Sequence, residues 1–236
     1  MGEIGQAFSI ALNLLWNLDN DLIAIVSLSL KVSIFAVVFS CFLGFTIGAG
    51  LTVYRFPGRK VFIIFLNSMM GLPPVVVGLM IYLLLSRSGP LGVLGLLYTP
   101  TAMIIAQITL ITPLVAALSL QTLQGLYGEY NEFFRSLNLP STTKMRTILW
   151  DGRFDLITIG LAGFGRAISE VGAVMIVGGN INHLTRIMTT AIALETSKGT
   201  LAFALALGII LISISILINA SVMIVRSLTK GPRHAG

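Results

Sequence analysis

Between Lys31 and Arg55 the chain carries no charged side chain, and most of the residues in this stretch are apolar. An α-helix needs about 20 apolar residues to cross the hydrocarbon core of a bilayer, so this stretch is long enough to span a membrane. Four other segments have a similar length and character. The five predicted spanning helices are approximately residues 22–54, 61–85, 101–123, 156–177 and 201–225. We therefore expect an all-α integral membrane protein in which residues 1–236 form a single transmembrane domain.

The composition supports this class. Only 10% of the residues are charged and 56% are apolar, whereas soluble domains carry about 25% charged residues. The net charge of +6 lies mainly in short loops between apolar runs, which is typical of membrane proteins and not of a nucleic-acid-binding face. One cysteine, Cys41, and two distant histidines, His183 and His234, provide neither an internal disulfide nor a metal site.

The first residues predict a short helix at the membrane surface. Residues 4–18 contain no Lys or Arg and follow Glu3, so they lack the basic region of a signal peptide. Their apolar residues form a short stripe that two asparagines interrupt, which is typical of an interfacial helix. The stripe consists of Phe8, Ile10, Leu12, Leu15 and Trp16.

The orientation follows from the basic residues, because Lys and Arg concentrate in cytoplasmic loops. If the loop after the first span is cytoplasmic, ten basic residues share that side: Arg55, Arg59, Lys60, Arg135, Lys144, Arg146, Arg153, Arg226, Lys230 and Arg233. The opposite side then holds Arg87, Arg186 and Lys198. We expect a multi-pass protein of the inner (plasma) membrane with its N-terminus outside and its C-terminus in the cytoplasm.

The largest predicted cytoplasmic feature is the segment of residues 129–150. Its first part predicts a short helix with Phe133, Phe134 and Leu137 on an apolar face. Pro140 ends that helix, and Ser141 or Thr142 is placed to cap a second helix that runs to Trp150. An interfacial loop packed under its own helices is the simpler alternative interpretation of this pattern.

The stretch from Glu132 to Pro140 resembles the Glu-Ala-Ala loop of binding-protein-dependent ABC transporter permeases, in which glycine follows an acidic residue by six positions. Here Phe133 and Phe134 replace the alanines, and Asn138 replaces the glycine. Asparagine tolerates a positive φ better than most residues do. The resemblance implies a coupling helix that contacts an ATP-hydrolysing subunit through Glu132, Phe133, Arg135, Asn138, Leu139 and Pro140.

Three further stretches narrow the resemblance. Residues 165–181 (GRAISEVGAVMIVGGNI) and 71–78 (GLPPVVVG) are similar to permeases for molybdate and tungstate, and residues 185–199 (TRIMTTAIALETSKG) to the tungstate branch. The resemblance implies the topology of a type I ABC importer permease whose oxyanion is tungstate, with molybdate as the alternative. It also implies a homodimer, two cytoplasmic ATPase subunits that bind ATP and Mg, an external oxyanion-binding protein, and no cofactor on this chain.

Two polar features lie inside predicted spans. Arg166 and Glu170 are four residues apart, so one continuous helix would place them on one face about 6 Å apart along its axis. They are either a mutually neutralising pair that orders the bundle or part of a translocation path or gate. Pro73 and Pro74 remove two backbone donors from an apolar run, so the helix must kink or unwind there. Such a break either improves packing or lines the path.

The remaining features exclude other classes or fit packing. No phosphate-binding Gly-x-x-x-x-Gly-Lys-Ser/Thr motif occurs, so the chain cannot hydrolyse ATP unaided. An ion-coupled secondary transporter would need repeat symmetry and more intramembrane carboxylates than Glu170, and an intramembrane enzyme would need a convergent catalytic set. Gly44, Gly48 and Gly50 offer a small-residue face for close helix contact. Lys31 receives no predicted role.

Overall fold

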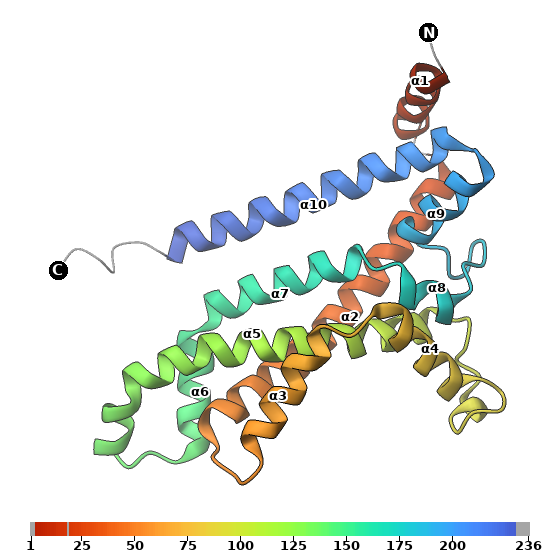
Figure 1. The fold of residues 1–236 in the computed structure, drawn as a ribbon. Helices are drawn as coiled ribbons and strands as arrows, with labels where there is room; N and C mark the ends of the chain where they lie inside the picture. Colours follow the sequence, from red (N-terminus) through yellow and green to blue (C-terminus); the bar gives the residue numbers. More distant parts are fainter. Residues whose placement is uncertain (1–2, 18, 230–236) are drawn as a thin grey trace. The chain divides into compact units, whose positions relative to one another are not determined.

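The chain is described here from a computed structural model that covers residues 3–17 and 19–229 (Figure 1). Every regular element in these residues is a helix. Lys230, Arg233 and His234 lie outside the described residues. The helices are α1 (Glu3–Trp16), α2 (Asn20–Val53), α3 (Arg59–Met70), α4 (Pro74–Leu85), the 3-10 helix η1 (Gly92–Leu94), α5 (Pro100–Ser136), α6 (Ser141–Asp151), α7 (Arg153–Ile168), α8 (Gly172–Gly178), α9 (Met188–Lys198) and α10 (Leu201–Thr229).

Three helices are each long and apolar enough to cross a membrane, namely α2, α5 and α10. Two further pairs pass the same test only as bent pairs: α3 with α4, bent by 102°, and α7 with α8, bent by 58°. The described residues therefore hold three spans, or up to five if each bent pair crosses as one. The chain is a multi-pass membrane protein, and the count of five stays a prediction, as does the interfacial position of α1.

One boundary differs from the sequence-based expectation. The short helix predicted over residues 129–137 is not a separate element, because α5 continues from the third predicted span without interruption to Ser136. Pro113 lies inside this helix, which spanning helices tolerate because neighbouring groups can satisfy the freed carbonyl. No proline occurs between Pro113 and Pro140, so nothing in the chain forces an earlier end.

The chain divides into two compact units, which we describe separately. The first unit comprises residues 1–36, 73–107 and 165–217, and the second comprises residues 37–72, 108–164 and 218–236. The predicted coupling segment belongs to the second unit. Pro73, Pro74, Arg166 and Glu170 belong to the first.

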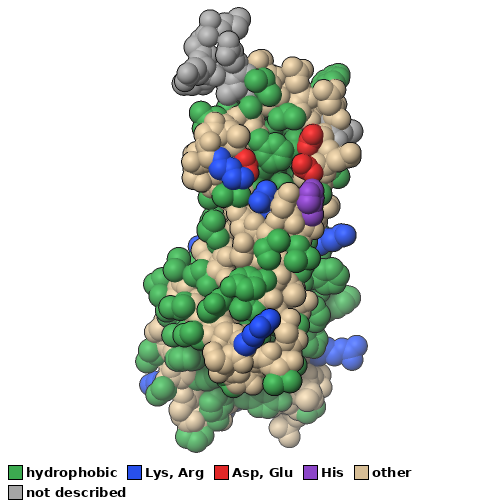
Figure 2. Space-filling model, turned by 90° about the vertical axis from the view of Figure 1, so that its right-hand side faces the viewer, with side chains coloured by type: hydrophobic (Ala, Val, Ile, Leu, Met, Phe, Trp, Pro, Cys, Tyr) green, Lys and Arg blue, Asp and Glu red, His purple; other side chains and the backbone are tan. Residues whose placement is uncertain are grey.

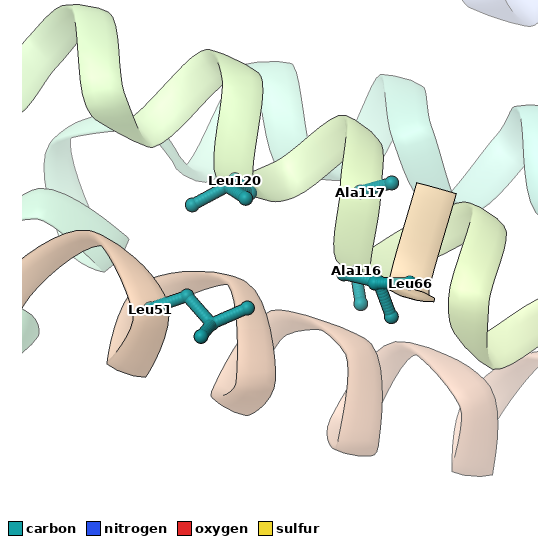
Figure 3. Packing of buried hydrophobic residues seen from close by; sticks show 5 residues of the cluster. All are labelled: Leu51, Leu66, Ala116, Ala117 and Leu120. Atoms are coloured by element: carbon teal, nitrogen blue, oxygen red, sulfur yellow. The ribbon is translucent and has the colours of Figure 1, made fainter. Parts of the chain in front are cut away.

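In the second unit, α2 and α5 approach closely at two of the three glycines for which the sequence predicted a close helix contact. A Cβ atom on Gly44 would lie 2.7 Å from Cγ1 of Val115, and one on Gly48 would lie 2.8 Å from Cβ of Ser119. At Gly50 there is nothing within 4 Å, so that glycine takes no part in the contact. The adjoining apolar cluster, with side chains from α2, α3 and α5, appears in Figure 3: Leu51, Leu66, Ala116, Ala117 and Leu120.

Candidate functional site

The end of α5 is anchored by one aromatic side chain. Phe134 is only 1% exposed, and its ring lies 5.7 Å from the ring centroids of both Tyr127 and Tyr130. The sequence predicted an apolar face made by Phe133, Phe134 and Leu137, and of these three only Phe134 is buried. Phe133 and Leu137 are each more than half exposed. Phe134 is the residue that packs against the two tyrosines, Tyr130 in the preceding turn and Tyr127 one turn before that. Glu132 and Arg135 are also exposed, so the outer surface of this turn is available to a partner.

Asn138 reverses the chain after α5 in a Schellman motif. Its φ is 45°, its N–H donates to the carbonyl of Arg135, and the N–H of Leu139 donates to the carbonyl of Phe134. This pair of bonds satisfies carbonyls that the end of a helix leaves open, and it needs a residue in the left-handed conformation. Asparagine therefore fills the backbone role expected of the glycine that it replaces.

Pro140 opens the second helix of this segment. Its φ of −68° and ψ of 152° place it at the N-cap of α6, and its carbonyl accepts the N–H of Lys144. The predicted cap by Ser141 or Thr142 is wrong, because α6 already begins at Ser141 and no side chain caps it. Ile148 of α6 is fully buried.

The Pro73–Pro74 pair breaks its helix as the sequence predicted. Helix α3 ends at Met70 and α4 begins at Pro74, and the two axes differ by 102°. Pro73 is extended, with a ψ of 124°, and Pro74 takes the first helical position. Proline suits that position because the first N–H groups of a helix have no partner within it.

A second break separates Arg166 from Glu170, so the predicted placement of both on one continuous helix is wrong. Helix α7 ends at Ile168, so Arg166 lies in its last turn and Glu170 lies between α7 and α8. The pair still meets: Nη2 of Arg166 lies 4.0 Å from Oε2 of Glu170. Arg166 is 47% exposed and Glu170 only 7%, so the carboxylate is the buried partner.

Glu170 holds the break together. Its Oε1 accepts the N–H of Ala173 at 3.3 Å, which satisfies a donor at the start of α8. Its carbonyl accepts the hydroxyl of Thr189 in α9 at 2.8 Å. The carboxylate of Glu170 therefore accepts a backbone N–H through one oxygen and faces the half-exposed guanidinium of Arg166 with the other.

The two broken spans meet through their second halves, α4 and α8. A Cβ on Gly78 would lie 2.7 Å from Cα of Ala173, and one on Gly172 would lie 2.7 Å from Cγ2 of Val75. Val75 follows Pro74, and Gly172 lies two residues after Glu170. The break at Pro73–Pro74 and the break at Glu170 therefore lie next to the same close contact between α4 and α8.

Comparison with known proteins identifies the family. The chain is 39% identical over 220 residues to the tungstate uptake system permease protein TupB of Peptoclostridium acidaminophilum, covering 93% of this chain and 96% of that protein. It is also 39% identical over 220 residues to a probable anion ABC transporter permease of Haloferax volcanii, covering 91% and 95%. A TupB permease of Campylobacter jejuni is 36% identical over 216 residues, covering 92% and 90%. No protein-family model matches the chain.

The chain belongs to this family of tungstate and anion ABC transporter permeases. It is therefore a permease subunit and not an enzyme, and ATP hydrolysis belongs to separate subunits of such transporters. A sulfate transport system permease of Synechococcus elongatus, 28% identical over 223 residues, fits the same assignment.

Besides Thr189, this site of the permease contains another buried polar residue that was not expected from the sequence. Gln107 of α5 is fully buried, and its Nε2 donates to the carbonyl of Ala167 at 3.0 Å. That carbonyl lies in the last turn of α7, just before the break at Glu170. The sequence offered one signal for this role: Gln107 is a lone amide in the largely apolar first half of the predicted span 101–123.

Proposed function

We propose that this permease carries tungstate across the plasma membrane in an ATP-driven importer, with molybdate as the alternative substrate. The observation that carries the proposal is the match, over more than nine-tenths of the chain, to two permeases named for tungstate uptake. The predicted orientation, with the N-terminus outside and the C-terminus in the cytoplasm, gives the direction of transport.

The same proposal includes the partners. Two copies of the permease form the path as a homodimer, two cytoplasmic ATPase subunits bind ATP and Mg, and an external binding protein delivers the oxyanion. The chain has no phosphate-binding motif of its own. The described residues hold at most five spans, which are few for a transporter built from paired repeats. Apolar side chains along α10, such as Ile212, Ile216 and Met223, are exposed and suit contact with lipid.

The coupling segment transmits the nucleotide state. Glu132, Phe133, Arg135, Asn138, Leu139 and Pro140 form the turn that docks on the ATPase, and five of these six side chains are exposed. Nucleotide can shift the permease only if the segment binds the ATPase differently in its two states. ATP binding would then draw the two segments together and open the path outward, and hydrolysis would reset it.

Transport in proteoliposomes tests the substrate. We expect the permease, assembled with the ATPase and binding protein encoded with it, to accumulate tungstate in an ATP-dependent manner. Excess molybdate should compete with tungstate, and excess sulfate should compete at least about tenfold less well, a difference of about 1.4 kcal/mol. ATP-dependent uptake of sulfate but neither of the other oxyanions would overturn the proposal.

Cysteine labelling tests the orientation. Cys41, the one cysteine of the chain, is first replaced by alanine, and a new cysteine is then introduced at Leu139. We expect an impermeant maleimide to label this site in inverted membrane vesicles and not in intact cells. Labelling only from outside the cell would place the coupling segment on the wrong side for an ATPase.

Pro73, Pro74, Arg166 and Glu170 line the path or its gate in this proposal. We expect Arg166→Gln to lower tungstate uptake at least about fivefold, because a half-exposed guanidinium is the cationic group placed beside the break. The melting temperature should stay unchanged, since the ion pair is long and partly exposed. Glu170→Ala should lower both uptake and melting temperature, because it also removes the acceptor for Ala173. Normal uptake in both variants would remove the pair from the mechanism.

A further inference from the structure

A second polar site lies in the first unit, between the start of α2 and the loop before α9. A pocket of about 240 Å³ is lined there by Asp21, Lys31, Asn182, His183 and Arg186 together with small and apolar residues of α2. Figure 2 shows Lys or Arg, Asp or Glu, and His side chains gathered in one area of a largely hydrophobic face. In the predicted orientation this pocket opens on the outer side of the membrane.

A hydrogen bond from a backbone N–H to a serine hydroxyl joins the loop to α2 close to the two cationic residues of this pocket. The N–H of Met188 donates to Oγ of Ser29 at 2.8 Å, and both residues are buried. Arg186 precedes Met188 by two residues, and Lys31 follows Ser29 by two. The loop and α2 thus hold the pocket in place before any ligand arrives, which lowers the entropic cost of binding.

The positive charge of the pocket is only partly balanced. Nε of Arg186 is buried without a hydrogen-bond partner in the described part of the chain, and its Nη1 lies 4.0 Å from Oε1 of Glu195. That carboxylate also binds Lys198 at 3.1 Å. The hydroxyl of Thr200, with Lys198 and Arg186, holds the pKa of Glu195 below its usual value, so Glu195 is ionised but shared between two cations.

The other carboxylate, Asp21, lies 4.0 Å from Nδ1 of His183. Within residues 3–17 and 19–229, no ion pair of 4.0 Å or less joins Lys31 to an acidic side chain. Lys31 and Arg186 therefore leave a surplus of positive charge beside the amide of Asn182 and the imidazole of His183. A charge inside or near the bilayer is costly unless something balances it.

We propose that this pocket binds a tetrahedral oxyanion, and that it is the outer receiving site for the transported substrate. The proposal rests on the function proposed above. An oxyanion with two negative charges presents several acceptor oxygens, which match the planar donor set of Arg186, the ammonium of Lys31 and the amide of Asn182. The volume leaves room for water molecules, each of which occupies about 30 Å³.

Direct binding tests the site without the binding protein. The purified permease–ATPase complex is dialysed against sodium tungstate, and bound tungsten is measured by mass spectrometry. We expect saturable binding, an at least about tenfold weaker Kd for Lys31→Gln and for Arg186→Gln, and partial recovery in Lys31→Arg and Arg186→Lys. Arg87→Gln, a matched loss of charge at an exposed residue outside the pocket, should stay within about twofold of the unchanged complex.

The same preparations separate the two proposals. Binding by Lys31→Gln and Arg186→Gln that equals the unchanged complex, or no saturable binding by the unchanged complex, would overturn the receiving site. If the unchanged permease–ATPase complex still imports tungstate when the binding protein is added, the proposed function stands. Loss of binding by Arg186→Gln supports the site only if the melting temperature of this variant is unchanged. Lys31→Gln is expected to fold normally, because the side chain of Lys31 is exposed.

Discussion

Replacing Asn138 by proline is expected to abolish the stimulation of ATP turnover by substrate-loaded binding protein, with a loss of at least about tenfold. Proline fixes φ near −65°, whereas Asn138 has a φ of 45°. The change also removes the N–H that donates to Arg135. The chain could then no longer reverse after α5 in its present form, and the docking surface would be lost while the spans that precede it remain.

Asn138→Gly is the matched control for this change. Glycine adopts the left-handed conformation without a steric penalty, so we expect ATP turnover within about twofold of the unchanged permease. Asn138→Val should fall between the two, because a β-branched side chain, unlike asparagine, costs about 1–2 kcal/mol in the left-handed conformation. The measurement is ATPase activity in proteoliposomes with and without loaded binding protein. Equal stimulation in Asn138→Pro and Asn138→Gly would refute the assigned role of this turn.

The second large effect is expected at Gly78. A leucine there would place its Cβ 2.7 Å from Cα of Ala173 and 3.1 Å from the carbonyl oxygen of the same residue. Backbone atoms cannot rotate away as the end of a side chain can, so α4 and α8 must separate. We expect Gly78→Leu to destabilise the first unit by about 3 kcal/mol or more and to eliminate transport.

Gly208→Leu controls for the added apolar volume, since nothing lies within 4 Å of a Cβ on Gly208. Thermal unfolding in detergent, followed by the loss of monodisperse protein, compares the two variants. Adding Ala173→Gly should not rescue Gly78→Leu, because the nearest atom is Cα of Ala173 and not its side chain. A melting temperature for Gly78→Leu equal to that of Gly208→Leu would show that the close contact is not required.

The two helix breaks explain what could be predicted from the sequence and what could not. The break at Pro73–Pro74 follows from residue chemistry alone, because two missing N–H groups cannot continue a helix in any surroundings. The break around Glu170 contains no proline, and it depends on distant partners: the hydroxyl of Thr189 binds the carbonyl of Glu170. The apolar run of residues 156–177 therefore predicted one continuous helix through Arg166 and Glu170, and the helix is in fact broken after Ile168.

In the predicted coupling segment, too, some features could be predicted from the sequence and others could not. The backbone role of Asn138 was predictable because few residues other than glycine accept a positive φ, and the structure gives it one. The burial of Phe134 without Phe133 and Leu137 was not predictable, because helical spacing alone does not say which side of the turn Tyr127 and Tyr130 cover. The pocket lined by Lys31 and Arg186 was missed altogether, since these residues lie far apart in sequence and come to one pocket only through the fold.

The bond between Met188 and Ser29 has a mechanical consequence. It attaches the loop before α9 to α2, on residues that are both buried. In the proposed orientation, a protein that displaces this loop from outside would have to break this bond or move α2 together with the loop.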